Sequence, residues 1–93
     1  MIRTINQTSR FRKEYRKAMR RGYDPALFEF VLNKIINEHQ LPEKYRDHAL
    51  TGKYSGFREC HIQQDWLLIY LIGKDVLTLT LIRTDTHPDL FGT

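Results

Sequence analysis

The chain of 93 residues is long enough for one domain, residues 1–93, and too short for two. A hydrophobic share of 41% with 28% charged residues excludes a largely disordered protein, and the net charge of +4 suits a partner that carries phosphates. The longest apolar run, 66–72, cannot cross a bilayer, and the amino terminus lacks the apolar stretch of a secretory signal, so we expect a cytoplasmic protein without a membrane partner.

Residues 2–6 alternate between apolar and polar side chains, which predicts a short first strand. Two helices are expected next, over 9–21 and 25–39, because apolar residues recur in both at spacings of three and four. Asp24 and Pro25 are a typical cap and first-turn pair for the second helix. Only a few residues separate the helices, so we expect an antiparallel hairpin whose apolar faces share one core.

The first helix carries most of the positive charge. Residues 1–23 hold eight basic side chains against Glu14 alone, a net charge of +7, whereas the remaining 70 residues have a net charge of −3. Such a segment favours a nucleic acid or another polyanion as partner, although many basic helices are only solvated faces.

After the second helix, residues 43–56 are expected to form a long polar loop. Three strands follow over 57–62, 66–72 and 76–84, with a tight turn at 73–75 and a short irregular tail from Asp85. This order predicts the α+β class, with an antiparallel sheet, an N-terminal helical hairpin on one face and the arrangement β-α-α-β-β-β. The opposite face would be open and shallow, bordered by the loop, the strand ends and the tail.

Three histidines lie in this second half of the chain: His48 in the loop, His61 near the end of a strand and His87 in the tail. Asp65 follows His61 across a short turn, so the two side chains could meet. A single histidine is more often a surface residue, but three together favour acid-base chemistry near neutral pH. RNA cleavage needs a base for the 2′-hydroxyl, cations for the phosphate and an acid for the leaving 5′-oxygen.

The same side chains are possible metal ligands, but no two have the short spacing that places two ligands on one helix or turn. We therefore expect no metal and no cofactor. Cys60, the single cysteine, lies in a predicted strand and is expected to be buried and reduced.

The second half contains the stretches DHALTGK at 47–53, GFRECHI at 56–62 and DWLLIY at 65–70, and it closes with Arg83-Thr84, Thr86-His87 and Leu90-Phe91-Gly92. Together these stretches resemble the signature of YafQ-type toxins, a branch of the RelE superfamily. The first half is similar in pattern only. The resemblance implies a RelE-like fold, ribosome-dependent cleavage of messenger RNA by a type II toxin, and neutralisation by a cognate antitoxin of the RelB or DinJ kind. We expect the basic first helix to contact ribosomal RNA, with a solvated or antitoxin-covered face as the alternative.

Position by position, the resemblance implies that His48 is the general base and His87 the general acid. His61 and Asp65 would orient groups and balance charge around the phosphate. Some RelE relatives use lysine, arginine and tyrosine instead, so the division of roles among the three histidines stays open.

The resemblance also implies a set of RNA contacts. Arg83 would stabilise the phosphate, and Phe91 would pack against a base. Lys53 and Arg46 could add phosphate contacts, with solvated loop charges as an equal alternative. Trp66 matches the signature as well, but a tryptophan beside the apolar run 67–69 is more often part of a core.

Other functions remain open at this stage. A ParE-like toxin would share the fold and bind a topoisomerase without cutting RNA, but the set of histidines argues against it. A simple RNA-binding module should show interleaved basic and aromatic residues, which this chain lacks. A relic of the fold without toxicity is a further alternative.

Overall fold

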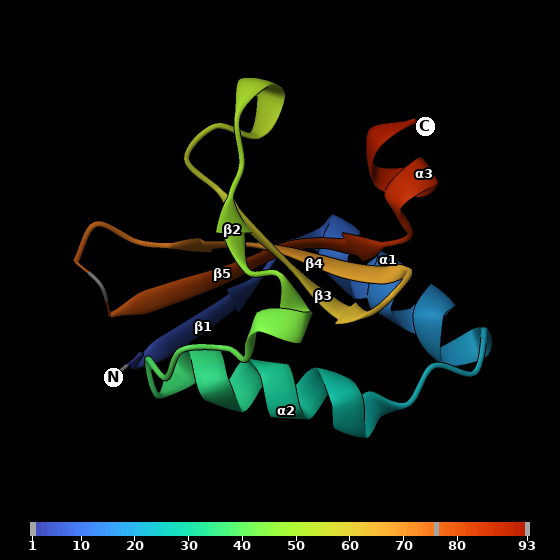
Figure 1. The fold of residues 1–93 in the computed structure, drawn as a ribbon, viewed down its shortest axis with the longest axis horizontal. Coiled ribbons are helices and arrows are strands. Elements are labelled where there is room, and N and C mark those ends of the chain that lie inside the picture. The colour runs from blue at the N-terminus through green and yellow to red at the C-terminus, as the bar shows by residue number, and fades with distance from the viewer. Residues whose placement is uncertain (1, 76, 93) are drawn as a thin grey trace.

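The computed structural model describes residues 2–75 and 77–92. A five-stranded sheet in the order β1-β5-β4-β3-β2 forms its centre (Figure 1). Along the chain the elements are β1 (Thr4–Gln7), α1 (Ser9–Arg20), α2 (Pro25–Ile36), the 3₁₀ turn η1 (Glu43–Tyr45), β2 (His48–Ala49), the 3₁₀ turn η2 (Gly52–Tyr54), β3 (Arg58–Gln63), β4 (Trp66–Ile72), β5 (Thr78–Asp85) and α3 (His87–Phe91). No described helix has the length and apolar character needed to span a membrane.

The expected α+β class and the helical hairpin are confirmed, but the sheet is mixed and not antiparallel throughout. β1 runs parallel to β5, with Thr4 opposite Thr78 and Gln7 opposite Leu81, while the other neighbouring strands are antiparallel. Parallel neighbours need a long connection, and here nearly the whole chain lies between the two strands. The alternation of residues 2–6 predicts a strand but carries no information about its distant neighbour.

Each helix of the hairpin begins at a side-chain cap. Phe11 N–H donates to Thr8 Oγ1 at 2.9 Å, and Ala26 N–H donates to Asp24 Oδ1 at the same distance. The second helix was expected to reach residue 39 but ends at Ile36, because Glu38 adopts a left-handed conformation with φ of 56°.

The alternation of β4 divides the packing into two layers. Trp66, Leu68 and Tyr70 point toward the hairpin and pack with helix residues in the larger core. Leu67 and Ile69 point to the opposite face. The larger core takes Phe11, Ala18, Phe28, Val31 and Ile35 from the two helices.

The opposite face was expected to be open, but a small second core covers part of it. Leu90 of α3 packs on Leu67 and Ile69, and partly buried side chains from residues 50–57 and Phe91 close around them. The tail is therefore a short helix and not an irregular segment. The loop predicted over 43–56 contains the two 3₁₀ turns and the two-residue strand β2. Val76, the expected first residue of the last strand, lies outside the described residues.

Strand β5 contains one residue more than its neighbour needs. Leu81 lies opposite Tyr70 and Arg83 opposite Ile69, so Ile82 has no partner on β4. Such a bulge moves every later residue by one step in the alternation of faces. Leu81 consequently points into the helix-side core, whereas Arg83 shares the opposite face with Ile69.

Candidate active site

A row of four residues crosses the sheet on the face opposite the helical hairpin. His48 of β2 lies opposite Glu59 of β3, Glu59 opposite Ile69 of β4, and Ile69 opposite Arg83 of β5. Residues directly opposite each other on antiparallel strands point to the same face. The row therefore joins a histidine, a carboxylate and an arginine on the face where α3 and the segment around η2 project (Figure 1).

Glu59 lies between two histidines. Its Oε1 is 3.5 Å from Nε2 of His48 and 4.0 Å from Nε2 of His61. The residue is 4% exposed, and its buried Oε2 has no hydrogen-bond partner among the described residues. A buried carboxylate is costly unless cations or donors surround it, so the two imidazoles stabilise Glu59 only when their Nε2 atoms carry a proton.

Backbone carbonyls hold both rings in one orientation. Nδ1 of His48 is 2.6 Å from the carbonyl oxygen of Arg46, and Nδ1 of His61 is 3.3 Å from that of Gln64. A carbonyl oxygen only accepts hydrogen bonds, so each Nδ1 carries the proton that it donates. In a neutral ring Nε2 is then unprotonated, and both Nε2 atoms face Glu59. His48 is about half exposed, which makes its Nε2 a base within reach of a substrate.

Asp47 anchors the loop that carries His48. It accepts a hydrogen bond of 2.5 Å from the Tyr70 hydroxyl and forms an ion pair of 3.2 Å with Arg58. Burial and the bond with Asp47 raise the pKa of Tyr70, which keeps the hydroxyl a donor at neutral pH. The bond with Asp47 also raises the pKa of Arg58. Arg46 adopts a left-handed conformation with φ of 50°, rare for a residue with a side chain, and its carbonyl accepts the His48 proton.

Arg83 is buried at the other end of the row. Its Nη2 is 2.6 Å from Oε2 of Glu14, and its Nη1 is 3.2 Å from the Tyr54 hydroxyl. Burial opposes the charge of Arg83, but the hydrogen bonds with Glu14 and Tyr54 outweigh it and raise the pKa. Glu14 also accepts a bond of 3.1 Å from the backbone N–H of Thr84, where β1 has ended and no longer pairs with β5. The Glu14 carboxylate thus forms the ion pair with Arg83 and accepts the hydrogen bond of a backbone N–H at the edge of β5.

Helix α3 places His87 and Phe91 beside this end of the row. The two rings are 4.7 Å apart between centroids, and Phe91 meets Tyr54 edge to face at 5.9 Å. His87 is exposed and Phe91 is partly buried. Tyr54 therefore contacts both Arg83 and Phe91, and it links the row to the helix.

Ion pairs with α1 hold the base of α3. Lys17 Nζ is 2.8 Å from Asp85 and 3.6 Å from Asp89, and Arg21 Nη1 is 3.5 Å and 3.7 Å from the same two carboxylates. The hydrogen bond with Asp85 raises the pKa of Lys17. The pKa of Asp89 is lowered, first by its hydrogen bond with Thr86 and then by Asp85 and the two cations.

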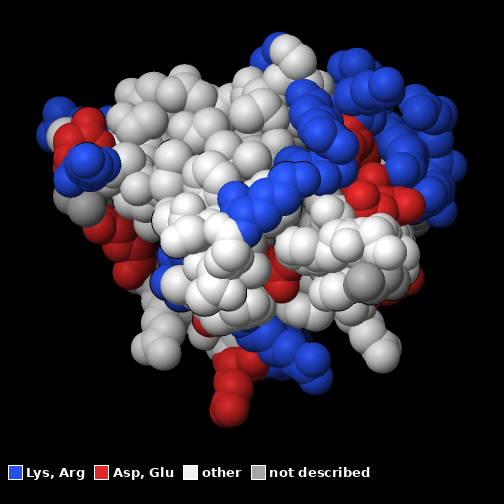
Figure 2. All heavy atoms as spheres, turned by 90° about the horizontal axis from the view of Figure 1, so that it is seen from above, with Lys and Arg blue, Asp and Glu red and all other residues white. Residues whose placement is uncertain are grey.

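Positive charge borders the site on the side of α1. Figure 2, which views this face from above, shows lysines and arginines gathered there with acidic side chains among them. Lys13, Arg16 and Arg20 are exposed and form no ion pair with another described residue. A hollow of about 600 Å³ next to Lys13 and Arg20 extends to Arg83.

Comparison with known proteins identifies the family of this chain. The family of bacterial toxins of type II toxin-antitoxin systems called YafQ matches residues 3–92. The mRNA interferase toxin YafQ of Escherichia coli K12 is 34% identical over 91 residues, which are 97% of each chain. The chain belongs to the YafQ family.

Solved structures agree with this assignment. A structure of the E. coli DinJ-YafQ complex matches with a TM-score of 0.87 and 34% identity over 97% of this chain and 99% of that one. A metal-bound toxin from Helicobacter pylori matches with a TM-score of 0.90 and 38% identity over 98% of this chain and the whole of that one. The expected YafQ-type resemblance is thereby confirmed.

The structure brings together most of the YafQ-type signature residues. His48 and His61 flank Glu59, and Arg83 ends the same row. His87 and Phe91 stand on α3 beside it. Lys53 and Arg46 are exposed on the loop, and the Lys53 ammonium lies 5.8 Å from the centre of the Tyr54 ring.

Two signature residues lie elsewhere. Trp66 is fully buried in the helix-side core and stacks on Tyr23 with ring centroids 4.9 Å apart, so an RNA base has no access to it in this fold. The expectation that it contacts RNA is corrected here, and its apolar neighbours are the reason. Asp65 is exposed at the β3–β4 turn, near Tyr23. Burial is the main cause that raises the pKa of the Tyr23 hydroxyl, and the charge of Asp65 raises it further.

Sequence reasoning missed Glu59 and Tyr54. Glu59 is two positions before His61 in a strand, a spacing that puts both on one face, so its position could have been inferred. Tyr54 lies in a loop without periodicity, and no local signal connects it to Arg83. Among the residues that the structure describes, no three side chains of the His, Cys, Asp or Glu type form a group able to hold a metal ion.

Proposed function

We propose that this YafQ-family chain is a toxin that cleaves messenger RNA on the ribosome by acid-base catalysis. The observation that carries the proposal is the pair of carbonyl-oriented histidines whose Nε2 atoms face one buried carboxylate, Glu59. Histidine is suited to proton transfer near neutral pH, and the E. coli relative bears the name mRNA interferase.

In the proposed reaction His48 Nε2 takes the proton of a ribose 2′-hydroxyl. The 2′-oxygen attacks the adjacent phosphorus, and the bond from phosphorus to the 5′-oxygen of the next nucleotide breaks. His87 donates a proton to that departing oxygen. The products end in a 2′,3′-cyclic phosphate and a 5′-hydroxyl, and no metal or cofactor takes part.

The other residues of the site would support this reaction. Glu59 would stabilise the imidazolium that forms when His48 accepts the proton. His61 would share the negative charge of Glu59. Phe91 would pack against a base beside His87. Arg83 would act on the phosphate from its position next to Tyr54, while its pairing with Glu14 limits how far it can move. Asp65 would contribute only where the RNA passes over the β3–β4 turn.

Lys53 and Arg46 would add contacts to the RNA backbone from the exposed loop. The exposed cations of α1 would bind ribosomal RNA, which is consistent with the hollow that connects α1 to Arg83. A shallow site on so small a chain has little means of bending a flexible RNA, so the ribosome would supply the in-line geometry. Binding through several cations should weaken steeply with salt. Equal cleavage rates on naked and ribosome-bound RNA would contradict this part of the proposal.

The proposed partner that silences the toxin is an antitoxin of the DinJ kind. The E. coli relative is seen in a complex with DinJ. Lys13, Arg16 and Arg20 lack ionic partners among the described residues, so an acidic segment would complement them. Co-expression with the neighbouring reading frames should yield a stable complex with one of them, and toxicity that no neighbour relieves would count against it.

The proton transfers are tested with a substrate whose bridging 5′-oxygen is replaced by sulfur. Alanine at either His48 or His87 should lower the single-turnover rate on ordinary RNA by about 10²- to 10⁴-fold. A thiolate leaves almost without an acid, so the sulfur substrate should restore much of the rate to His87→Ala and little to His48→Ala.

His39→Ala is the matched control, because His39 is exposed at the end of the helical hairpin. It should cleave both substrates at the wild-type rate. Rescue of His48→Ala in place of His87→Ala would reverse the two roles. Unimpaired cleavage by both variants would refute the proposed mechanism.

A further inference from the structure

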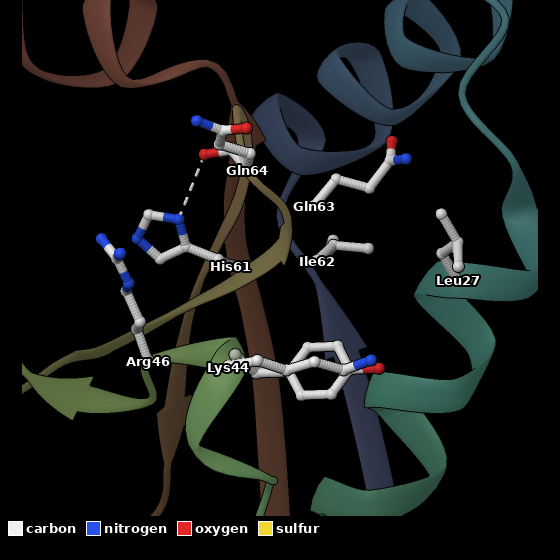
Figure 3. A pocket seen from close by; sticks show the side chains of 8 residues that line it. Leu27, Lys44, Arg46, His61, Ile62, Gln63 and Gln64 are labelled. Carbon is white, nitrogen blue, oxygen red and sulfur yellow. Dashed lines mark hydrogen bonds between the residues drawn. The ribbon is translucent and has the colours of Figure 1, made fainter.

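A hollow of about 470 Å³ adjoins the candidate active site at the outer edge of β3 (Figure 3). Strand β2 pairs with β3 at Arg58 and Glu59, and within residues 2–75 and 77–92 no strand pairs with this edge of β3 from His61 onward. The hollow occupies this position, between the strand edge, the turn η1 and the start of α2. His61 lines it on the side of the active site.

One part of the lining is apolar. Ile62 is 3% exposed and belongs to the helix-side core, and Leu27 of α2 forms a wall. The Tyr45 ring forms another part of the lining and stacks on Phe30, at 5.6 Å between centroids. These apolar side chains can accept the flat face of an aromatic ring.

The remaining lining of the hollow is polar and basic. The side chains of Gln63 and Gln64 are exposed and make no hydrogen bond with another described residue. Each amide offers a donor and an acceptor, the groups with which proteins read base edges. Lys44 and Arg46 are both exposed, on η1 and on the residue after it, and no acidic side chain among the described residues lines the hollow. The charge therefore suits a phosphate-linked base.

We propose that this hollow binds one unstacked RNA base and that Gln63 and Gln64 determine which base is accepted. The proposal rests on the ribonuclease function proposed above. Arg46 joins the two sites, since its side chain lines the hollow and its carbonyl holds the His48 ring.

The position of the hollow also identifies the nucleotide. His48 takes the proton of the 2′-hydroxyl on the 5′ side of the cleaved bond, and the hollow lies on the His48 and His61 side of the site. The bound base therefore belongs to the nucleotide immediately 5′ of the cut. The nucleotide on the 3′ side lies toward His87 and Phe91.

The test maps cleavage sites on translated messages by sequencing the new RNA ends. The double variant Gln63→Ala/Gln64→Ala should lose about tenfold of its preference for the favoured base immediately 5′ of the cut, the usual magnitude of a specific base contact. Cleavage summed over all sites should persist, and the preference on the 3′ side should be unchanged. Lys44→Ala should instead lower cleavage at all sites by a similar factor.

Gln7→Ala is the matched control, because Gln7 is an exposed glutamine of β1 at the opposite edge of the sheet. It should keep the wild-type preference. Cleavage by the double variant with an unchanged preference would overturn the base-binding proposal while leaving the ribonuclease intact. A changed preference on the 3′ side alone would also overturn it. Wild-type protein that cuts no RNA would overturn the proposed function itself.

Discussion

Arg83 and Glu14 are 69 positions apart in the chain and form an ion pair of 2.6 Å in which each side chain is only 9% exposed. Glu14 is the single acidic residue of the basic segment 1–23. Its carboxylate joins α1 to β5 and neutralises an arginine that faces the candidate active site. The stability of the fold should therefore depend on this pair.

Glu14→Ala should lower the free energy of unfolding by about 3 kcal/mol, because it leaves a buried guanidinium without its partner. Urea denaturation measures this change. The exposed Glu29→Ala on α2 is the control and should stay within about 0.5 kcal/mol of wild type. In the double variant Glu14→Ala/Arg83→Met, part of the lost stability should return. A Glu14→Ala protein as stable as the control would show that the pair has no structural role.

Glu59→Gln should reduce cleavage by about 10- to 100-fold while leaving the protein at least as stable as wild type. The substitution removes the charge beside His48 and His61 but keeps the volume, and one buried oxygen of Glu59 already has no hydrogen-bond partner in the described part of the chain. Single-turnover rates and urea denaturation measure the two effects. Nitrogen chemical shifts of the imidazoles should show Nδ1–H retained on both rings. Cleavage at the wild-type rate would remove Glu59 from the reaction.

The attachment of α3 should depend on acidity. An acid whose pKa is lowered on folding stabilises the folded arrangement at pH values above its ordinary pKa, which is 3.8 for Asp89. That contribution is lost as the pH falls through the lowered pKa. The methyl resonances of Leu90, which α3 packs on the sheet, should therefore stay constant at neutral pH and shift when the pH falls below 3.8. Asp89→Asn should show a smaller acid-induced shift. An identical titration in both proteins would assign the effect to other groups.

Cys60 should resist alkylation in the folded protein. It is fully buried, and burial raises the pKa of its thiol, so the reactive thiolate is scarce at pH 8. N-ethylmaleimide followed by mass spectrometry should find the thiol unmodified until the protein is unfolded. A cysteine introduced at the exposed Ser55 should react at once under the same conditions. Rapid modification of Cys60 itself would mean that β3 opens readily.

The sequence was most informative where the structural signal was local. The three- and four-residue spacing and the caps Thr8 and Asp24 predicted both long helices, and the apolar neighbours of Trp66 already favoured a core position over a base contact. The parallel pairing of β1 with β5 was not predictable, because it joins segments more than 70 residues apart. The five-residue α3 is too short for a periodic pattern.

The candidate site shows the same division. His48 and His61 were singled out by residue type, and alternation along β3 places Glu59 beside them. Asp65 was expected near His61, but the turn carries it toward Tyr23 while His61 bonds the Gln64 carbonyl. Tyr54 reaches Arg83 through a loop whose path depends on packing against α3. Such contacts require the assembled fold.

The unpaired Ile82 determines which changes of length and register strand β5 can tolerate. Losing Ile82 would give a regular ladder in which Arg83 still lies opposite Ile69 and keeps its face. Straightening the strand with all its residues kept would instead place Arg83 opposite Leu68 and turn the guanidinium into the apolar layer beneath the helices. Replacing the half-buried Ile82 with another aliphatic residue would disturb far less. The register beyond the bulge, and not the identity of Ile82, therefore decides whether Arg83 lies on the face of the candidate active site.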